Sequence, residues 1–189
     1  MHKEMLSMKM SHSKKIVFSA VCATLCIVLP MAFHSVPNAG TVFLPMHIPV
    51  LLCGLICGWP FGFVCGLIGP FLSSLLTGMP AAAILPAMTV ECATYGLVTG
   101  LMMKFVWTKS SVADLYISML TAMILGRSVA GLAKALIFTP GAAPFAWVTT
   151  SLITGMPGIC IQLIVMPVVV FALRRARLIP SRYAKEEPV

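Results

Sequence analysis

The feature that most limits the fold of this chain is a series of long apolar runs with almost no charge inside them. The first run, residues 16–33, contains no charged residue at all. Only 10% of the chain is charged and 59% is hydrophobic, whereas a soluble domain has about a quarter charged residues. Because an apolar helix of about 20 residues crosses the hydrocarbon core of a bilayer, we expect most of the chain to lie in lipid. This excludes a disordered chain, a disulfide scaffold and a soluble enzyme on a membrane anchor, since too few residues remain to bury a separate core.

The runs predict an all-α integral membrane protein, a bundle of six transmembrane helices. The predicted spans are residues 16–33, 47–58, 61–76, a fourth that begins between Ala81 and Pro86 and ends near Met103, 115–138, and 156–173. The last span could instead begin at Trp147 and kink at Pro157. We favour the later start, which leaves residues 144–155 as a loop or interfacial segment. The first run could also be read as a secretory signal peptide, but it is longer than the roughly 7 to 15 residues of a usual hydrophobic region.

The positions of the basic residues predict the orientation. All Lys and Arg except Arg127 and Lys134 lie in the N-terminal tail, the linker after the fourth span or the C-terminal tail, and segments 34–46, 77–81 and 139–155 contain none. By the positive-inside rule both termini are therefore cytoplasmic. We expect residues 1–15 and 176–189 to be basic cytoplasmic tails around a membrane domain of residues 16–175. The net charge of +8 thus has a topological explanation, which removes the argument for a nucleic-acid partner.

Small residues at four-residue spacing predict where helices touch, because helices in lipid associate by close packing. One series predicts two GxxxG pairs in a tightly crossed hairpin of the second and third spans: Gly54, Gly58, Gly62 and Gly66. A second small face lies on the first span and could pack inside the bundle or against another protein: Ser19, Ala20, Ala23 and Thr24. A short repeat, residues 73–80 (SSLLTGMP) and 150–157 (TSLITGMP), predicts two similar turns at the outer rim.

No residue pattern predicts catalysis or a metal site. The seven cysteines lie in apolar surroundings without nearby His or acidic ligands, so we interpret them as small buried hydrophobes. The chain has no GxSxG or HExxH motif, no pair of acids within one span and no P-loop. We therefore expect neither an enzyme nor a bound cofactor, and any active uptake would need ion coupling or separate ATPase subunits.

Charged residues inside the predicted spans are the main candidates for a functional site, because ionisable groups in hydrocarbon are costly unless paired or hydrated. Glu91 shares a helix face with Tyr95 in the fourth span, and Arg127 shares one with Lys134 in the fifth. These spans are antiparallel neighbours, so Glu91 can meet either cation. One carboxylate against two cations leaves a surplus positive charge, which predicts water access or an anionic ligand such as a carboxylate.

Other polar residues predict the limits of the same site. Gln162 is a buried polar group in the outer half of the sixth span. Asn38 and His47 precede the second span and are candidates for the mouth of the site, although His47 could be an ordinary interfacial residue. Trp147 could act as a stacking lid or belong to an interfacial aromatic belt.

Several stretches together resemble the S components of energy-coupling factor (ECF) transporters. They are residues 43–58 (FLPMHIPVLLCGLICG), the Gly-rich third span ending in residues 75–80 (LLTGMP), residues 91–96 (ECATYG), and Pro157-Gly158 followed by Gln162. The resemblance covers roughly residues 14–175. It implies a binding subunit of the bacterial plasma membrane that captures a vitamin or similar micronutrient from outside. It also implies docking on one transmembrane coupling protein and two ATPases, which alone would use ATP.

The resemblance also implies where ligand and partner would bind. S components bind substrate in the outer half with their fourth to sixth helices and outer loops, where Glu91, Tyr95, Arg127, Lys134 and Gln162 lie. They meet the coupling protein through an AxxxA-like face on the first helix. The corresponding residues here are Ser19 and Ala23, or Ala20 and Thr24, so the register of this face is left open.

The function hypothesis is therefore a vitamin-binding S component, and the surplus cation favours a carboxylate-bearing substrate such as pantothenate or niacin. The alternative is a small self-sufficient secondary transporter or channel in which Glu91 relays an ion. An intramembrane enzyme is a third possibility.

Overall fold

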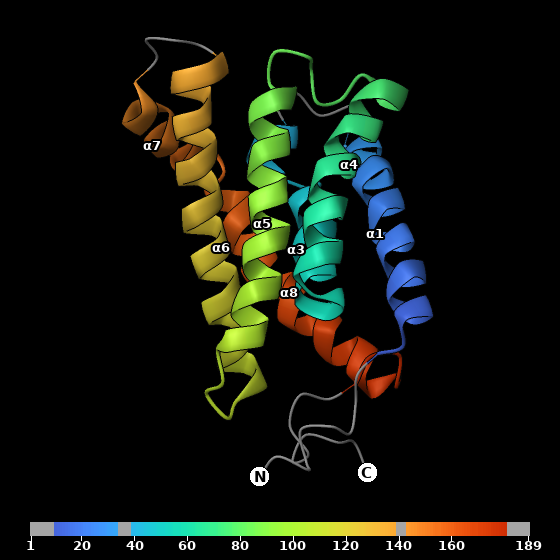
Figure 1. Ribbon diagram of the computed structural model, residues 1–189. Helices are drawn as coiled ribbons and strands as arrows, with labels where there is room; N and C mark the ends of the chain where they lie inside the picture. The colour runs from blue at the N-terminus through green and yellow to red at the C-terminus, as the bar shows by residue number, and fades with distance from the viewer. Residues whose placement is uncertain (1–9, 34–38, 139–142, 181–189) are drawn as a thin grey trace.

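The computed structural model of the chain describes residues 10–33, 39–138 and 143–180, which are mostly helical and contain no strand. The helices form a bundle, with α5 between α4 and α6 and with α7 beside the end of α6 (Figure 1). The elements are α1 (His12–Ala32), α2 (Ala39–Phe43), α3 (His47–Cys57), α4 (Trp59–Thr77), α5 (Leu85–Phe105), α6 (Ser111–Ala133), the π-helical turn η2 (Lys134–Phe138), α7 (Pro144–Thr154) and α8 (Met156–Arg175). The prediction of an all-helical membrane bundle is confirmed.

Within the described residues, five segments are long and apolar enough to cross a membrane. They are α1, Gly40–Cys57, α4, Ser111–Phe138 and α8. The 21-residue helix α5 is not among them, although it packs between α4 and α6 and carries Glu91. Polar side chains within α5 lower its mean hydropathy while its neighbours shield them. The sixth span, α5, therefore stays a prediction.

Residues 144–154 form a helix, so the alternative of a loop in this region was wrong. Pro144 lies at the start of α7, where a missing N–H costs nothing. The hydroxyls of Thr149 and Ser151 bond back to carbonyls of the same helix. The predicted late start of the last span is confirmed, because α8 begins at Met156 directly after Gly155.

The two copies of the short repeat form different turns, contrary to the prediction of similar ones. Gly78 ends α4 in the left-handed region, with φ 72°, and is followed by a loop that leads to α5. Gly155 has φ −84° and ψ 1° and joins α7 to α8 without a loop. The sequences match, but only the first copy must reverse the chain toward a separate helix, so only that copy needs a left-handed residue.

A seam of small residues holds α3, α4 and α5 together. At Gly62 and Gly96 the backbones of α4 and α5 touch, and a Cβ on either glycine would overlap the peptide group of the other. A Cβ on Gly62 would also lie 2.7 Å from the Cα of Gly54, so α3 and α4 cross there as predicted. Gly66 lies against Cys92 in the same seam. The GxxxG spacing thus predicted close contact correctly but could not show that α5 is the shared partner.

The described ends of the bundle agree with the predicted topology. Figure 1 shows the start of α1, the connection between α5 and α6 and the end of α8 at the same end of the molecule. This end carries Lys104, Lys109 and the arginines that close α8. If it is cytoplasmic, as the positive-inside rule predicts, then the starts of α3, α5 and α8 lie at the outer end.

Candidate functional site

A buried polar cluster surrounds the carboxylate of Glu91 in the half of the bundle where α5 begins. Its Oε1 accepts a hydrogen bond of 2.8 Å from the hydroxyl of Tyr95. The Nε2 of His47 lies 3.5 Å from the same oxygen, and the Nε of Arg127 lies 3.7 Å from it. Glu91 is only 6% exposed and Arg127 only 2%. Three helices therefore contribute to one desolvated site, with α5 supplying the anion and α3 and α6 the basic groups.

Local sequence explains how these side chains meet. Glu91 and Tyr95 are one turn apart, so both point from the same face of α5. The Tyr95 ring lies against Gly126 of α6, where a Cβ would overlap the ring. This close approach places the next residue, Arg127, beside Glu91. The centroids of the His47 and Tyr95 rings are 5.1 Å apart, and this ring contact holds His47 beside the carboxylate of Glu91.

Arg127, rather than Lys134, is the ion-pair partner of Glu91, so the structure resolves the pairing that the sequence left open. Its Nη1 donates a hydrogen bond of 2.8 Å to the carbonyl of Ser151 in α7. Within the described part of the chain, its Nε and Nη2 have no hydrogen-bond acceptor. The distance of 3.7 Å to Glu91 is an electrostatic contact and is too long for a hydrogen bond.

Lys134, the first residue of η2, lies two turns beyond Arg127 and contacts the predicted lid residue. Its Nζ is 5.5 Å from the centroid of the Trp147 ring, a cation–π distance. Among the described residues Lys134 has no carboxylate partner. Two side-chain contacts thus link this part of the chain to α7: Arg127 of α6 to Ser151, and Lys134 of η2 to Trp147.

Gln162 supports the site without reaching the ion pair. It is buried, and its Nε2 donates to the carbonyl of Leu44 at 3.3 Å. The backbone N–H of His47 donates to the same carbonyl. Leu44 has φ 51°, a left-handed conformation that is uncommon for a residue with a side chain. Gln162 therefore helps to hold the turn that delivers His47, a role that sequence reasoning missed. The remaining candidate, Asn38, lies outside the described residues.

The small face of α1 lines a shallow apolar groove between α1 and α4. The groove encloses about 340 Å³ and is lined by Ser19, Ala20, Ala23, Pro60, Phe61, Val64, Cys65 and Ile68. The hydroxyl of Ser19 points into the bundle, where it donates a hydrogen bond to the carbonyl of Lys15 and accepts one from the thiol of Cys53. Ala20 and Thr24 are exposed. The two registers considered for this face thus differ, with Ser19 and Ala23 partly buried and Ala20 and Thr24 outward.

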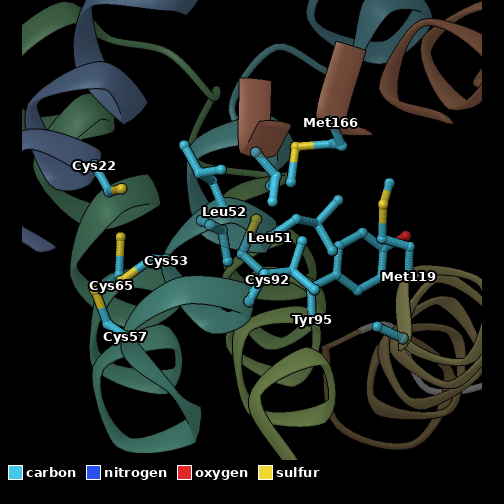
Figure 2. Close-up of a cluster of buried hydrophobic side chains, with 14 of the residues drawn as sticks. Cys22, Leu51, Leu52, Cys53, Cys57, Cys65, Cys92, Tyr95, Met119 and Met166 are labelled. Atoms are coloured by element: carbon cyan, nitrogen blue, oxygen red, sulfur yellow. The ribbon is translucent and has the colours of Figure 1, made fainter. Parts of the chain in front are cut away.

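Six of the cysteines are buried, as predicted, whereas Cys160 is exposed. Figure 2 shows the thiols of Cys22, Cys53, Cys57 and Cys65 on one side of the hydrophobic core, away from Tyr95. Over residues 10–33, 39–138 and 143–180, no group of three His, Cys, Asp or Glu side chains could hold a metal ion.

Comparison with known proteins identifies the family. The family model described as "ECF transporter, substrate-specific component" matches residues 14–170, most of the chain. No curated protein matches the chain. The family match agrees with the resemblance seen in the sequence and with the helical bundle that holds a polar cluster within apolar helices. The chain therefore belongs to the family of substrate-specific components of ECF transporters.

Proposed function

We propose that this chain is the substrate-binding subunit of an ATP-driven importer in a bacterial plasma membrane. It captures a water-soluble vitamin that bears a carboxylate, such as pantothenate or niacin, in the outer half of the bundle. It performs no chemistry itself and needs no cofactor. One transmembrane coupling protein and two ATPases supply the energy. The family membership supports the role in substrate binding. The buried polar cluster around Glu91 supports the proposed location of the substrate site.

The charge balance of the site is the observation that carries the substrate proposal. Arg127 balances the charge of Glu91. Lys134 is then the surplus cation, half-buried near the outer rim with Trp147 beside it. A carboxylate would neutralise Lys134, and a hydrogen bond between two charged groups is stronger than one between neutral groups. Trp147 offers an apolar ring face next to that charge.

The coupling protein would contact the outward residues of the α1 face. Ala20 and Thr24 are exposed, and Ala20 lines the groove against Phe61 and Val64 of α4. A helix of the coupling protein could approach closely there because the side chains are small. Ser19 and Ala23 would then support this surface from within.

A second candidate function is favoured by one distance. His47 lies 3.5 Å from Glu91 inside the bundle, and such pairs serve as proton relays in secondary transporters. In that case the chain would transport its substrate alone, driven by an ion gradient.

The substrate proposal predicts that Lys134→Met weakens binding of the carboxylate ligand by about ten- to a hundredfold, since a hydrogen bond to a charged group contributes about 1.5 to 3 kcal/mol. Mass spectrometry of the small molecule retained through purification would first identify the ligand. Calorimetry would then compare nicotinate with nicotinamide and pantothenate with pantothenol, pairs that differ at the carboxylate.

Lys104→Met is a matched control. Lys104 also lies over an aromatic ring, with its Nζ 5.4 Å from the Phe105 centroid, but at the other end of the bundle. Its replacement should leave the affinity unchanged. Equal affinity for an acid and its amide, together with an unaffected Lys134→Met, would refute the carboxylate substrate.

A further inference from the structure

A shallow apolar groove runs between α1 and α4 at the end of the bundle where both helices begin (Figure 1). Small residues of α1 form one wall, and larger apolar side chains of α4 form the other. From Pro60 to Ile68 the groove follows α4 for about two turns, roughly 12 Å. Val64 and Ile68 are 49% and 43% exposed on a helix that is long and apolar enough to cross a membrane, so the groove opens toward lipid.

The lining of the groove suits a hydrocarbon chain better than a polar ligand. Ser19 carries the one hydroxyl of the lining, and this hydroxyl already bonds to the carbonyl of Lys15 and the thiol of Cys53. Cys65 is 3% exposed and behaves as a small hydrophobe. The other lining side chains belong to alanine, proline, phenylalanine, valine and isoleucine. A polar molecule would therefore lose its hydration in the groove without gaining hydrogen bonds.

The mouth of the groove is basic. Lys14 and Lys15 lie in the first turn of α1, about one turn before the groove begins. Trp59, 43% exposed at the start of α4, is of a residue type enriched at the level of lipid headgroups. Asp114 is the one acid among the described residues of this end, and it is fully buried and bonded to Thr108. The described basic residues of this end are Lys14, Lys15, Lys104, Lys109, Arg174, Arg175 and Arg177.

We propose that this groove binds one anionic phospholipid, such as phosphatidylglycerol. Its phosphate lies at Lys14 and Lys15, and one acyl chain lies in the groove between α1 and α4. The two contacts act together, because hydrocarbon alone does not distinguish one phospholipid from another and basic residues alone do not select a place on the surface. If this end is cytoplasmic, as the positive-inside rule predicts, the lipid belongs to the inner leaflet.

The lipid site overlaps the surface proposed for the coupling protein. Ala20 lines the groove and is one of the residues that the coupling protein would approach. The phospholipid therefore occupies this face in the free subunit and must leave before the coupling protein docks. Only this competition rests on the proposed function, since lipid binding depends on the chain alone.

Quenching of Trp59 fluorescence by brominated phospholipids tests the lipid site. The chain has three tryptophans, so Trp107→Phe/Trp147→Phe leaves Trp59 as the reporter. The full chain would be reconstituted in phosphatidylcholine vesicles that contain equal fractions of brominated phosphatidylglycerol or brominated phosphatidylcholine. We expect stronger quenching by the phosphatidylglycerol. Lys14→Gln/Lys15→Gln should reduce this preference by about 25-fold, since each basic residue near an anionic lipid surface contributes about fivefold.

Matched variants separate the groove from the general charge of this end. Lys104→Gln/Lys109→Gln removes the same charge at the connection between α5 and α6 and should leave the preference unchanged. Ala20→Phe fills the groove while both lysines of α1 remain, and it should abolish the preference. Val21→Phe is its control, because Val21 is 51% exposed on α1 and does not line the groove.

Equal quenching of the reporter chain by the two brominated lipids would overturn the proposal. A preference that survives Lys14→Gln/Lys15→Gln, or that Lys104→Gln/Lys109→Gln removes equally, would overturn the position of the headgroup. A preference that survives Ala20→Phe would overturn the position of the acyl chain.

Addition of the coupling protein and the two ATPases tests the competition separately. Quenching by brominated phosphatidylglycerol should then fall, because the lipid leaves the groove. Quenching that stays the same while these proteins bind would overturn the competition. Failure of these proteins to bind at all would count against the proposed function, whereas the measurements on the chain alone decide the lipid site.

Discussion

Arg127→Met should destabilise the protein by about 3 to 5 kcal/mol, the usual cost of removing one partner from a buried ion pair. The reason is that Glu91, 6% exposed, would keep a buried charge without its cation. Adding Glu91→Gln should recover most of this loss, because an amide can still accept the hydrogen bond of Tyr95. Unfolding in mixed micelles measures the stabilities.

The double variant distinguishes an electrostatic role from simple packing. Arg175→Met removes an exposed arginine of α8 and should change the stability by no more than about 0.5 kcal/mol. If Glu91→Gln/Arg127→Met were as unstable as Arg127→Met alone, the loss would come from the missing guanidinium and its bond to Ser151. The ion pair would then contribute little, contrary to the geometry described above.

Gly96→Ala should cost about 3 kcal/mol or more, beyond the usual 1 to 3 kcal/mol of overpacking, because the obstacle is backbone. The added methyl group would overlap the backbone carbonyl group of Gly62. The overlap can be relieved only if α4 and α5 move apart. Since α5 carries Glu91 and Tyr95, ligand affinity should fall with stability. Thermal unfolding and gel filtration of the purified protein provide the measurement.

Gly40→Ala is the control, since no atom of the described residues would lie within 4 Å of a methyl group there. Equal unfolding temperatures for Gly96→Ala and Gly40→Ala would contradict the backbone contact between α4 and α5. They would also remove the explanation for the small residues at Gly62 and Gly66.

The sequence predicted the features that depend on composition and local spacing. Charge-free runs identified the helices, and basic residues predicted an orientation that agrees with the ends of α1 and α8. Glu91 and Arg127 could be singled out because charge is costly in lipid. The i, i+4 spacing placed Tyr95 beside Glu91. Each of these inferences depends only on the residues of a single helix and on whether lipid or water surrounds it.

Features that depend on the register between helices could not be predicted. Whether Glu91 meets Arg127 or Lys134 depends on how far α5 slides along α6, and that is set by the Tyr95 ring against Gly126. The role of Gln162 depends on Leu44, distant in sequence and held in a left-handed turn. Residues 144–154 were predicted as a loop or interfacial segment, with a helix from Trp147 as the alternative, and they form a helix. The sequence could not decide because a short apolar segment without charge is typical of both loops and helices at an interface.

Uptake by reconstituted liposomes distinguishes a binding subunit that needs ATPase partners from a self-sufficient transporter. The chain, purified alone or with the proteins that accompany it from native membranes, would be supplied with the vitamin it retains. We expect ATP-dependent accumulation only when the coupling protein and ATPases are present, and none by the chain alone under a proton or sodium gradient. Accumulation by the chain alone under such a gradient, without ATP, would contradict it and would favour the relay through His47 and Glu91.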